Sequence, residues 1–232
     1  MKLEIFDSYN IRARISVVLF FIVPFFVDWL FVFSSNFTVT ENIFVVVLLI
    51  VLFQSILNLS RPKAMQYSEN YAATILSPKS QIPEITRKRY YRKLATFEPE
   101  FSDFGCKISE WKNKITDNLC ESAVVWLRSK TRDKNIFYLV HEENTNYGYY
   151  RNMYKLKKSG IILNCVAVFA LVIMILCPHL ESFKPSNFEI LLLVSIHLFQ
   201  IVYLSLAITK DAVETAAKRY AKSLVEAIDI IA

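Results

Sequence analysis

The chain has only three glycines among its 232 residues, and this scarcity excludes a glycine-rich loop that cradles phosphate groups. It also lacks the GxxxxGK[ST], HExxH, GxSxG and CxxC patterns of common nucleotide-, metal- and serine-dependent enzymes. The three histidines are scattered at His141, His179 and His197, without metal-ligand spacing. We therefore expect no enzyme, no bound metal and no cofactor.

Cysteine is also scarce, and its positions do not suggest a disulfide framework. Cys106 and Cys120 lie in a polar region, whereas Cys165 and Cys177 lie within or beside an apolar block. We expect reduced thiols that face either the cytosol or lipid.

Hydrophobic residues are abundant and are gathered in blocks. They make up 54% of the chain, against roughly 45–50% in ordinary soluble domains. The four blocks cover residues 17–33, 43–59, 161–177 and 190–208. Each is about as long as the roughly 17–25 residues of a membrane-crossing helix. The sequence therefore predicts an all-α integral membrane protein with four transmembrane helices in two hairpins and a central helical cytosolic domain.

Basic residues flank the blocks on one side of the predicted membrane. Arg12 and Arg14 precede the first block, Arg61 and Lys63 follow the second, and Lys155, Lys157, Lys158 and Lys210 flank the others. The two short connections between paired blocks hold one basic residue, Lys184. The excess of basic residues on cytoplasmic loops places both termini and the central domain in the cytoplasm.

Four regions follow from these blocks. Residues 1–60 form an interfacial segment and the first hairpin, 61–158 a basic cytosolic domain, 159–208 the second hairpin, and 209–232 a cytosolic C-terminal helix. Residues 61–158 hold nineteen Lys and Arg against eleven Asp and Glu, a net charge of +8. An amphipathic helix is predicted over residues 108–128, and the apolar stripe of the C-terminal helix predicts packing on this domain or self-association.

The densest basic cluster of the cytosolic domain is TRKRYYRKL, which follows Pro83. Basic side chains neutralise phosphate and aromatic rings stack on bases, so this segment is a candidate ligand site. A helix facing solvent or lipid headgroups explains the same composition. The candidate ligand-binding residues are Arg87, Lys88, Arg89, Tyr90, Tyr91, Arg92 and Lys93.

A tyrosine-rich and basic stretch, residues 142–160, leads directly into the third block. Helical spacing places Tyr147, Arg151, Tyr154 and Lys158 on one face. One interpretation is an interfacial anchor that holds lipid headgroups. The other is a coupling helix that carries a cytosolic event into the membrane.

Several polar residues interrupt the apolar blocks. Asp28 is either an acid near the outer headgroups or part of a pore or subunit contact, since a carboxylate within a span is costly. Gln54 and Asn58 share a helical face and serve either helix–helix contact or pore lining. Asn164, His197 and Gln200 form a similar polar set in the third and fourth blocks. Asp28, Gln54 and Asn58 are the pore candidates.

Three segments carry a resemblance to a known family: SYNIRARI before the first block, WLRSKTRD, and ENTNYGYYRNMYKLKKSGI at the third block. They resemble small bacterial four-span proteins whose usual form of the last segment is close to ENxxYGFRRNLxGLKPxGI. Tyr150 stands where that family has arginine, and Lys158 where it has proline. The family resembles membrane effectors of anti-phage defence, including the channel effector of the Hailong system and the four-span effectors of cyclic-oligonucleotide systems.

The resemblance implies a pore-forming effector of the bacterial inner membrane that depolarises an infected cell. Its implied partners are membrane lipid, further copies of itself in a homo-oligomer such as a tetramer, and an anionic nucleotide or single-stranded oligonucleotide ligand. A nucleotidyltransferase encoded nearby would make that ligand. An alternative hypothesis is a non-conducting scaffold that recruits a soluble partner. A small transporter is a third hypothesis with less support, because the sequence lacks the internal repeat usual in transporters.

Overall fold

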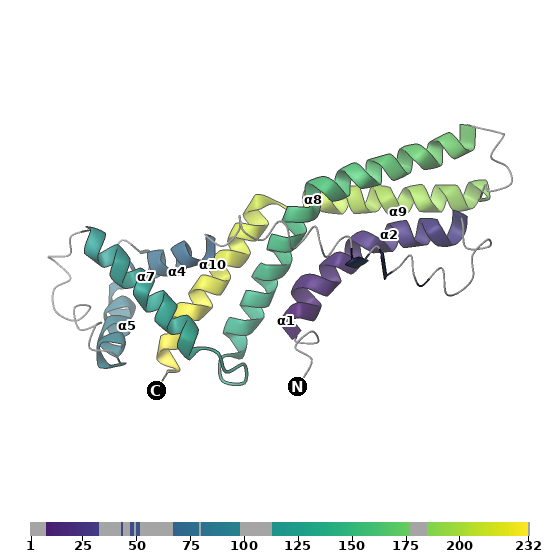
Figure 1. Cartoon of the computed structure of the whole chain (residues 1–232). Coiled ribbons are helices and arrows are strands. Elements are labelled where there is room, and N and C mark those ends of the chain that lie inside the picture. The colour runs from purple at the N-terminus through teal and green to yellow at the C-terminus, as the bar shows by residue number, and fades with distance from the viewer. Residues whose placement is uncertain are drawn as a thin grey trace. The chain divides into compact units, whose positions relative to one another are not determined.

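The computed structural model describes residues 8–32, 43, 47–48, 50–51, 67–78, 80–97, 113–176 and 185–231. Throughout these ranges the regular structure is helical and no strand occurs, which confirms the predicted all-α class (Figure 1). The chain divides into two compact units. The membrane unit comprises Met1–Pro62 and Gly148–Val213, and the helical unit comprises Lys63–Tyr147 and Glu214–Ala232.

Three helices of the described chain are long and apolar enough to cross a membrane. The first joins a π-helix, Ile11–Ile15, to α2 (Ser16–Val32), after the short α1 (Ser8–Asn10). The others are α8 (Tyr138–Leu176) and α9 (Asn187–Leu206). These helices could span a membrane and thereby support the prediction of a membrane protein. Most of the second predicted block, residues 43–59, lies outside the described residues.

The order of contacts along α2, α8 and α9 fixes their directions. The Asn152 amide of α8 donates to the Ala13 carbonyl oxygen at 2.7 Å, and further along both helices Val32 and Leu171 share an apolar cluster. Therefore α2 and α8 run in the same direction. Lys157 contacts the Ile208 carbonyl oxygen, whereas Leu171 packs with Ile190, so α9 runs in the opposite direction. Figure 1 shows the three helices side by side.

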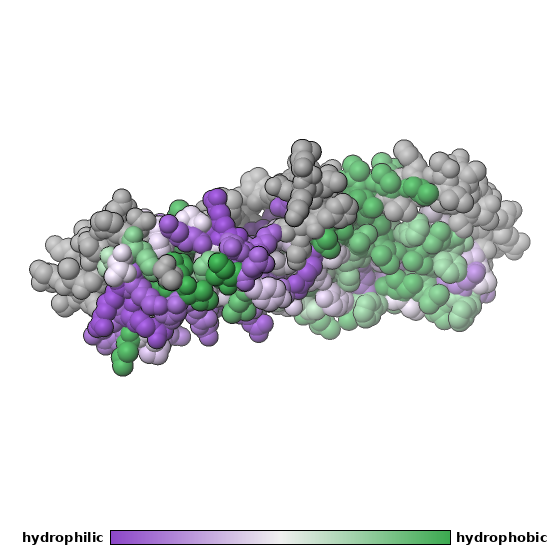
Figure 2. Space-filling model, turned by 90° about the horizontal axis from the view of Figure 1, so that it is seen from below, coloured by the Kyte–Doolittle hydropathy of each residue, from purple (hydrophilic) through white to green (hydrophobic). Residues whose placement is uncertain are grey.

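The membrane unit presents apolar side chains outward. Its core cluster includes Phe21, Met153, Leu156 and Leu204, while Phe169 and many other large apolar residues are exposed. In Figure 2 the hydrophobic surface gathers over these helices. Such a surface requires lipid or protein around it, because water would solvate it poorly.

The helical unit contains α4 (Tyr67–Leu76), α5 (Glu84–Phe97), α7 (Asn113–Lys130), the first ten residues of α8, and most of α10 (Lys210–Glu226) with the 3₁₀ turn Ala227–Asp229. The predicted helix over residues 108–128 corresponds to α7, and its first five residues lie outside the described ranges. Leu76, Leu94, Leu127 and Leu224 are fully buried. The apolar stripe of α10 therefore packs within this unit.

Candidate functional site

The basic segment folds as α5, which begins at Glu84 directly after Pro83. Proline suits the start of a helix, and a carboxylate in the first turn is favoured by the helix dipole. The Lys88 ammonium lies 2.6 Å from the Glu84 carboxylate one turn away. The hydrogen bond from Lys88 and its positive charge, with a smaller contribution from Arg87, lower the pKa of Glu84.

Most of the basic side chains of α5 already have partners within the helical unit. Arg89 and Lys93 both pair with Asp229, at 2.7 and 3.1 Å, and a guanidinium nitrogen of Arg87 lies 3.5 Å from the Ser80 carbonyl oxygen. Arg92 is exposed and forms no ion pair with any residue that the structure describes. The positive surface that the sequence predicts is therefore partly neutralised by Asp229.

The two tyrosines of α5 lie in different surroundings from those the sequence suggests. Tyr91 is 1% exposed and its hydroxyl donates to the Leu76 carbonyl oxygen, so its ring packs in the core and has no open face for a base. Burial raises the pKa of Tyr91. Tyr90 is also largely buried, and burial followed by the nearby Asp229 charge raises its pKa. Tyr90 lines a pocket.

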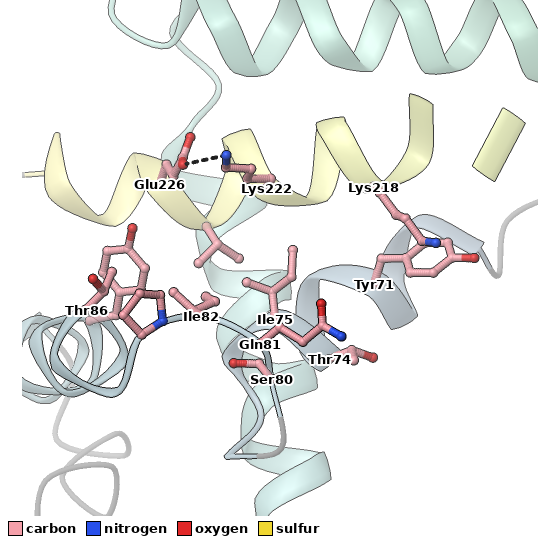
Figure 3. Close-up of a pocket in the computed structure, with 13 residues that line it drawn as sticks. Tyr71, Thr74, Ile75, Ser80, Gln81, Ile82, Thr86, Lys218, Lys222 and Glu226 are labelled. Carbon is pink, nitrogen blue, oxygen red and sulfur yellow. Dashed lines mark ion pairs between the residues drawn. The ribbon is translucent and has the colours of Figure 1, made fainter. Parts of the chain in front are cut away.

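That pocket has a volume of about 890 Å³ and lies between α4, the turn before α5 and α10 (Figure 3). Lys218 and Lys222 reach it from α10, and Tyr71 and Thr74 from α4. The Lys218 ammonium lies over the Tyr71 ring, 5.5 Å from its centroid, and Lys222 lies 3.8 Å from the Glu226 carboxylate. The remaining lining residues are Ile75, Ser80, Gln81, Ile82, Pro83, Thr86, Tyr90, Val225 and Glu226.

The pocket combines the groups that an anionic ligand with a flat ring requires. Two lysines supply positive charge, although Lys218 lies 3.0 Å from the Glu214 carboxylate and Lys222 pairs with Glu226. Ile75, Ile82 and Val225 supply apolar surface for a ring. The Ser80 hydroxyl is buried and has no hydrogen-bond partner in the part of the chain that the structure describes. Sequence reasoning missed this pocket because its two lysines come from the C-terminal helix, far along the chain from the α5 cluster.

The four predicted coupling residues all belong to α8 but divide between the two units. Tyr147 is buried in the helical unit, where its ring stacks on Tyr220 with centroids 6.3 Å apart. Arg151 is partly buried, and Tyr154 and Lys158 are exposed, all three in the membrane unit. A second face of the same helix, with Met153 and Leu156, packs into the core of the membrane unit.

The polar residues of the membrane helices contact one another. Asp28 of α2 and Asn164 of α8 both bond to the ring of His197 of α9, at 2.7 and 2.6 Å. The Gln200 amide donates to the Phe20 carbonyl oxygen at 2.6 Å. Asp28 thus contacts another helix of its own chain, and the other two pore candidates, Gln54 and Asn58, lie outside the described residues.

Comparison with protein-family models, with curated proteins and with solved structures gives no match to this chain. Function is therefore inferred from the pocket, the helices and the membrane unit themselves.

Proposed function

We propose that the protein is an oligomeric, pore-forming ion channel of the bacterial inner membrane, gated by a nucleotide or oligonucleotide bound to its helical unit, and that it acts as an effector of anti-phage defence. The observation that supports this most directly is the continuity of α8. Residues 138–147 of this helix belong to the unit with the pocket, and residues 148–176 belong to the unit with the apolar helices. A helix shared in this way can carry a change in one unit into the other.

The ligand site of this proposal is the pocket rather than the α5 surface alone. Lys218 and Lys222 would contact phosphate, and Tyr90 would lie beside the ligand ring. Arg92 extends the positive charge on α5, whereas Arg89 and Lys93 would have to leave Asp229 to reach a ligand. The pocket lysines would likewise exchange Glu214 and Glu226 for the phosphate. Ligand changes the open fraction only if it binds one state more tightly than the other.

The directions of α2 and α8 support a fourth crossing. Because both helices run the same way, the chain between Val32 and Gly148 must return to the starting side if both cross a membrane. The one apolar block in that interval is residues 43–59. We therefore retain four spans in two hairpins, with both termini and the central domain in the cytoplasm, as part of the proposal.

A homo-oligomer, such as a tetramer, is part of the same proposal. The polar side chains of the three described spans are bonded within one chain, and the outward faces of these spans are apolar. One chain thus offers no wide aqueous path among its described helices, and a pore would form between subunits. Gln54 and Asn58 are the polar residues of the remaining block that would face it.

The test is potassium efflux from potassium-loaded liposomes into which the full chain has been reconstituted. Cyclic dinucleotides and short oligoadenylates serve as probes. We expect at least one probe to change the efflux rate of the wild type, and Lys218→Glu with Lys222→Glu to abolish that response. Arg132→Glu with Lys134→Glu places the same charge change on the exposed turn after α7, away from the pocket lining, and should preserve the response.

Equal responses in both charge-reversed variants would contradict the assignment of the pocket. A protein that binds a probe without any change in efflux would contradict the pore and favour the non-conducting scaffold. In cells, a voltage-sensitive dye should report depolarisation when the wild type is expressed with its nucleotide source.

A further inference from the structure

Three helices of the membrane unit meet at a buried hydrogen-bonded chain. The Asn164 amide nitrogen of α8 donates to the Gly160 carbonyl oxygen at 2.7 Å. The Asn164 carbonyl oxygen lies 2.6 Å from His197 Nδ1, and His197 Nε2 lies 2.7 Å from a carboxylate oxygen of Asp28. Asn164 and His197 are both completely buried. We propose that Asp28, His197 and Asn164 form a proton-binding site inside the membrane unit.

The orientation of the Asn164 amide follows from its partner. A backbone carbonyl oxygen only accepts hydrogen bonds, so the atom that faces Gly160 must be the amide nitrogen. The amide oxygen therefore faces His197, and because it also only accepts, His197 Nδ1 must carry a proton. The tautomer of His197 is thus set by a residue on another helix.

This assignment leaves one further proton to place between His197 and Asp28. In a neutral ring with a proton on Nδ1, Nε2 is an acceptor, and an ionised carboxylate is an acceptor as well. Two acceptors 2.7 Å apart repel, so a proton lies between them. It resides either on the Asp28 oxygen or on Nε2, and in both forms the pair has no net charge. Transfer of this proton between the Asp28 oxygen and Nε2 leaves the net charge of the pair unchanged.

The surroundings contain no other described charge that would replace this proton. The Phe25 ring of α2 lies edge-on to the imidazole with centroids 5.3 Å apart. From α8 the facing group is the neutral Asn164 amide. Lys157 lies about two turns from Asn164, and its ammonium contacts the carbonyl oxygens of Ser205 and Ile208. Among the described residues, no group of three His, Cys, Asp or Glu side chains is placed to hold a metal ion.

The number of protons on the Asp28–His197 pair therefore controls the contact between α2 and α9. Loss of the shared proton to hydroxide leaves two facing acceptors, and gain of a second proton from hydronium leaves a buried imidazolium whose carboxylate partner is neutral. The Asp28 side chain is 20% exposed while that of His197 is 0% exposed, and the second Asp28 carboxylate oxygen, Oδ1, is buried without a hydrogen-bond partner among the described residues. The bound ligand of this site is a proton, and binding holds the three helices together.

The experiment is nitrogen NMR of the full chain in lipid nanodiscs, with the histidine rings labelled with ¹⁵N. Loss of a signal in His197→Gln separates His197 from His141 and His179. We expect His197 to show a protonated Nδ1 and an Nε2 signal displaced by the shared proton at neutral pH. Asp28→Asn should remove the displacement of Nε2, whereas Ser195→Ala, an exposed neighbour on α9, should leave it unchanged.

A His197 signal with an unprotonated Nδ1, or an Nε2 signal without the displacement, would overturn the proposal. If Asp28→Asn does not fold, the wild-type spectrum decides the question by itself. A second readout is thermal unfolding of the nanodisc samples. The wild type should lose stability below and above a plateau near neutral pH, and Ser195→Ala should follow the same curve. An identical pH dependence of thermal stability in wild type and Asp28→Asn would also contradict the proposed proton-binding site.

Discussion

The two units distribute polar and apolar residues in opposite ways. The membrane unit exposes Val166 and Phe169 and buries Asn164 and His197. The helical unit buries Leu94 and Leu127 and exposes charged residues along α5 and α10. Both arrangements occur in one continuous chain, and α8 contributes to each. The contrast is the one expected if lipid surrounds the membrane unit and water surrounds the helical unit.

The contrast also explains why buried polar groups are tolerated in the membrane unit. A charged side chain near the centre of a bilayer costs about 2.5–3.5 kcal/mol on insertion scales. Asp28 bonds to His197, and Asn164 and Gln200 bond to backbone carbonyl oxygens, so these side chains have hydrogen-bond partners that lipid would not supply. In the helical unit water solvates polar side chains, and its buried residues are therefore mostly apolar.

Two matched substitutions test whether the units face different solvents. Val166 of α8 is 60% exposed and Val125 of α7 is 64% exposed. Val166→Asp should make membrane insertion less favourable by up to about 3 kcal/mol, the cost near the bilayer centre. Val125→Asp should change stability by no more than about 0.5 kcal/mol, as expected for an exposed position in water. Membrane fractionation and thermal unfolding of the full chain measure the two effects. Similar losses in both variants would show that the units share one environment.

A smaller effect is expected from close packing within the membrane unit. A Cβ atom at Gly160 would collide with the Phe21 ring, which is fully buried, and would lie 3.3 Å from Leu204. Gly160→Ala should destabilise the membrane unit by about 1–3 kcal/mol, as overpacked cores do, despite the better helix propensity of alanine. Thermal unfolding in nanodiscs measures this loss.

The double variant Gly160→Ala with Phe21→Leu supplies the critical comparison, because the smaller side chain makes room for the new methyl group. It should recover part of the loss. Ser159→Ala, an exposed neighbour on α8, controls for helix propensity and should not destabilise. If Phe21→Leu increases the loss of stability caused by Gly160→Ala, the contact between residue 160 and the Phe21 ring is not the cause of that loss.

The sequence was sufficient to predict the class of the fold, since hydropathy blocks and helical stripes depend on neighbouring residues. The apolar helices of the membrane unit and the buried stripe of α10 follow those patterns. Contacts between distant segments were not predictable. Asp28 and His197 are 169 residues apart, and neither residue alone distinguishes a mutual contact from an interfacial acid and a buried histidine.

The candidate ligand site illustrates the same difference. Counting charges identified α5 as basic, but Asp229, 140 residues from Arg89, neutralises part of that surface. The pocket lysines, Lys218 and Lys222, belong to a helix selected in the sequence only for its apolar stripe. A count along the chain weighs all charges equally, whereas folding decides which of them are paired.

The smallest expected effect concerns Tyr91, the residue whose burial distinguishes a core ring from a ligand contact. Tyr91→Phe removes the hydroxyl that donates to Leu76 and should cost about 0.5–1.5 kcal/mol near neutral pH. Because burial raises the pKa of Tyr91 in the folded protein, its protonated form contributes stability that is complete below about pH 10 and is lost as the pH rises towards the folded value. Denaturant unfolding of the full chain, followed by the fluorescence of its tryptophans, should therefore show a weaker loss of stability above pH 10 in Tyr91→Phe than in the wild type.

Tyr138→Phe, at a position 66% exposed, should leave stability near neutral pH unchanged. Equal alkaline losses in wild type and Tyr91→Phe would show that Tyr91 does not keep its proton in the core of the helical unit.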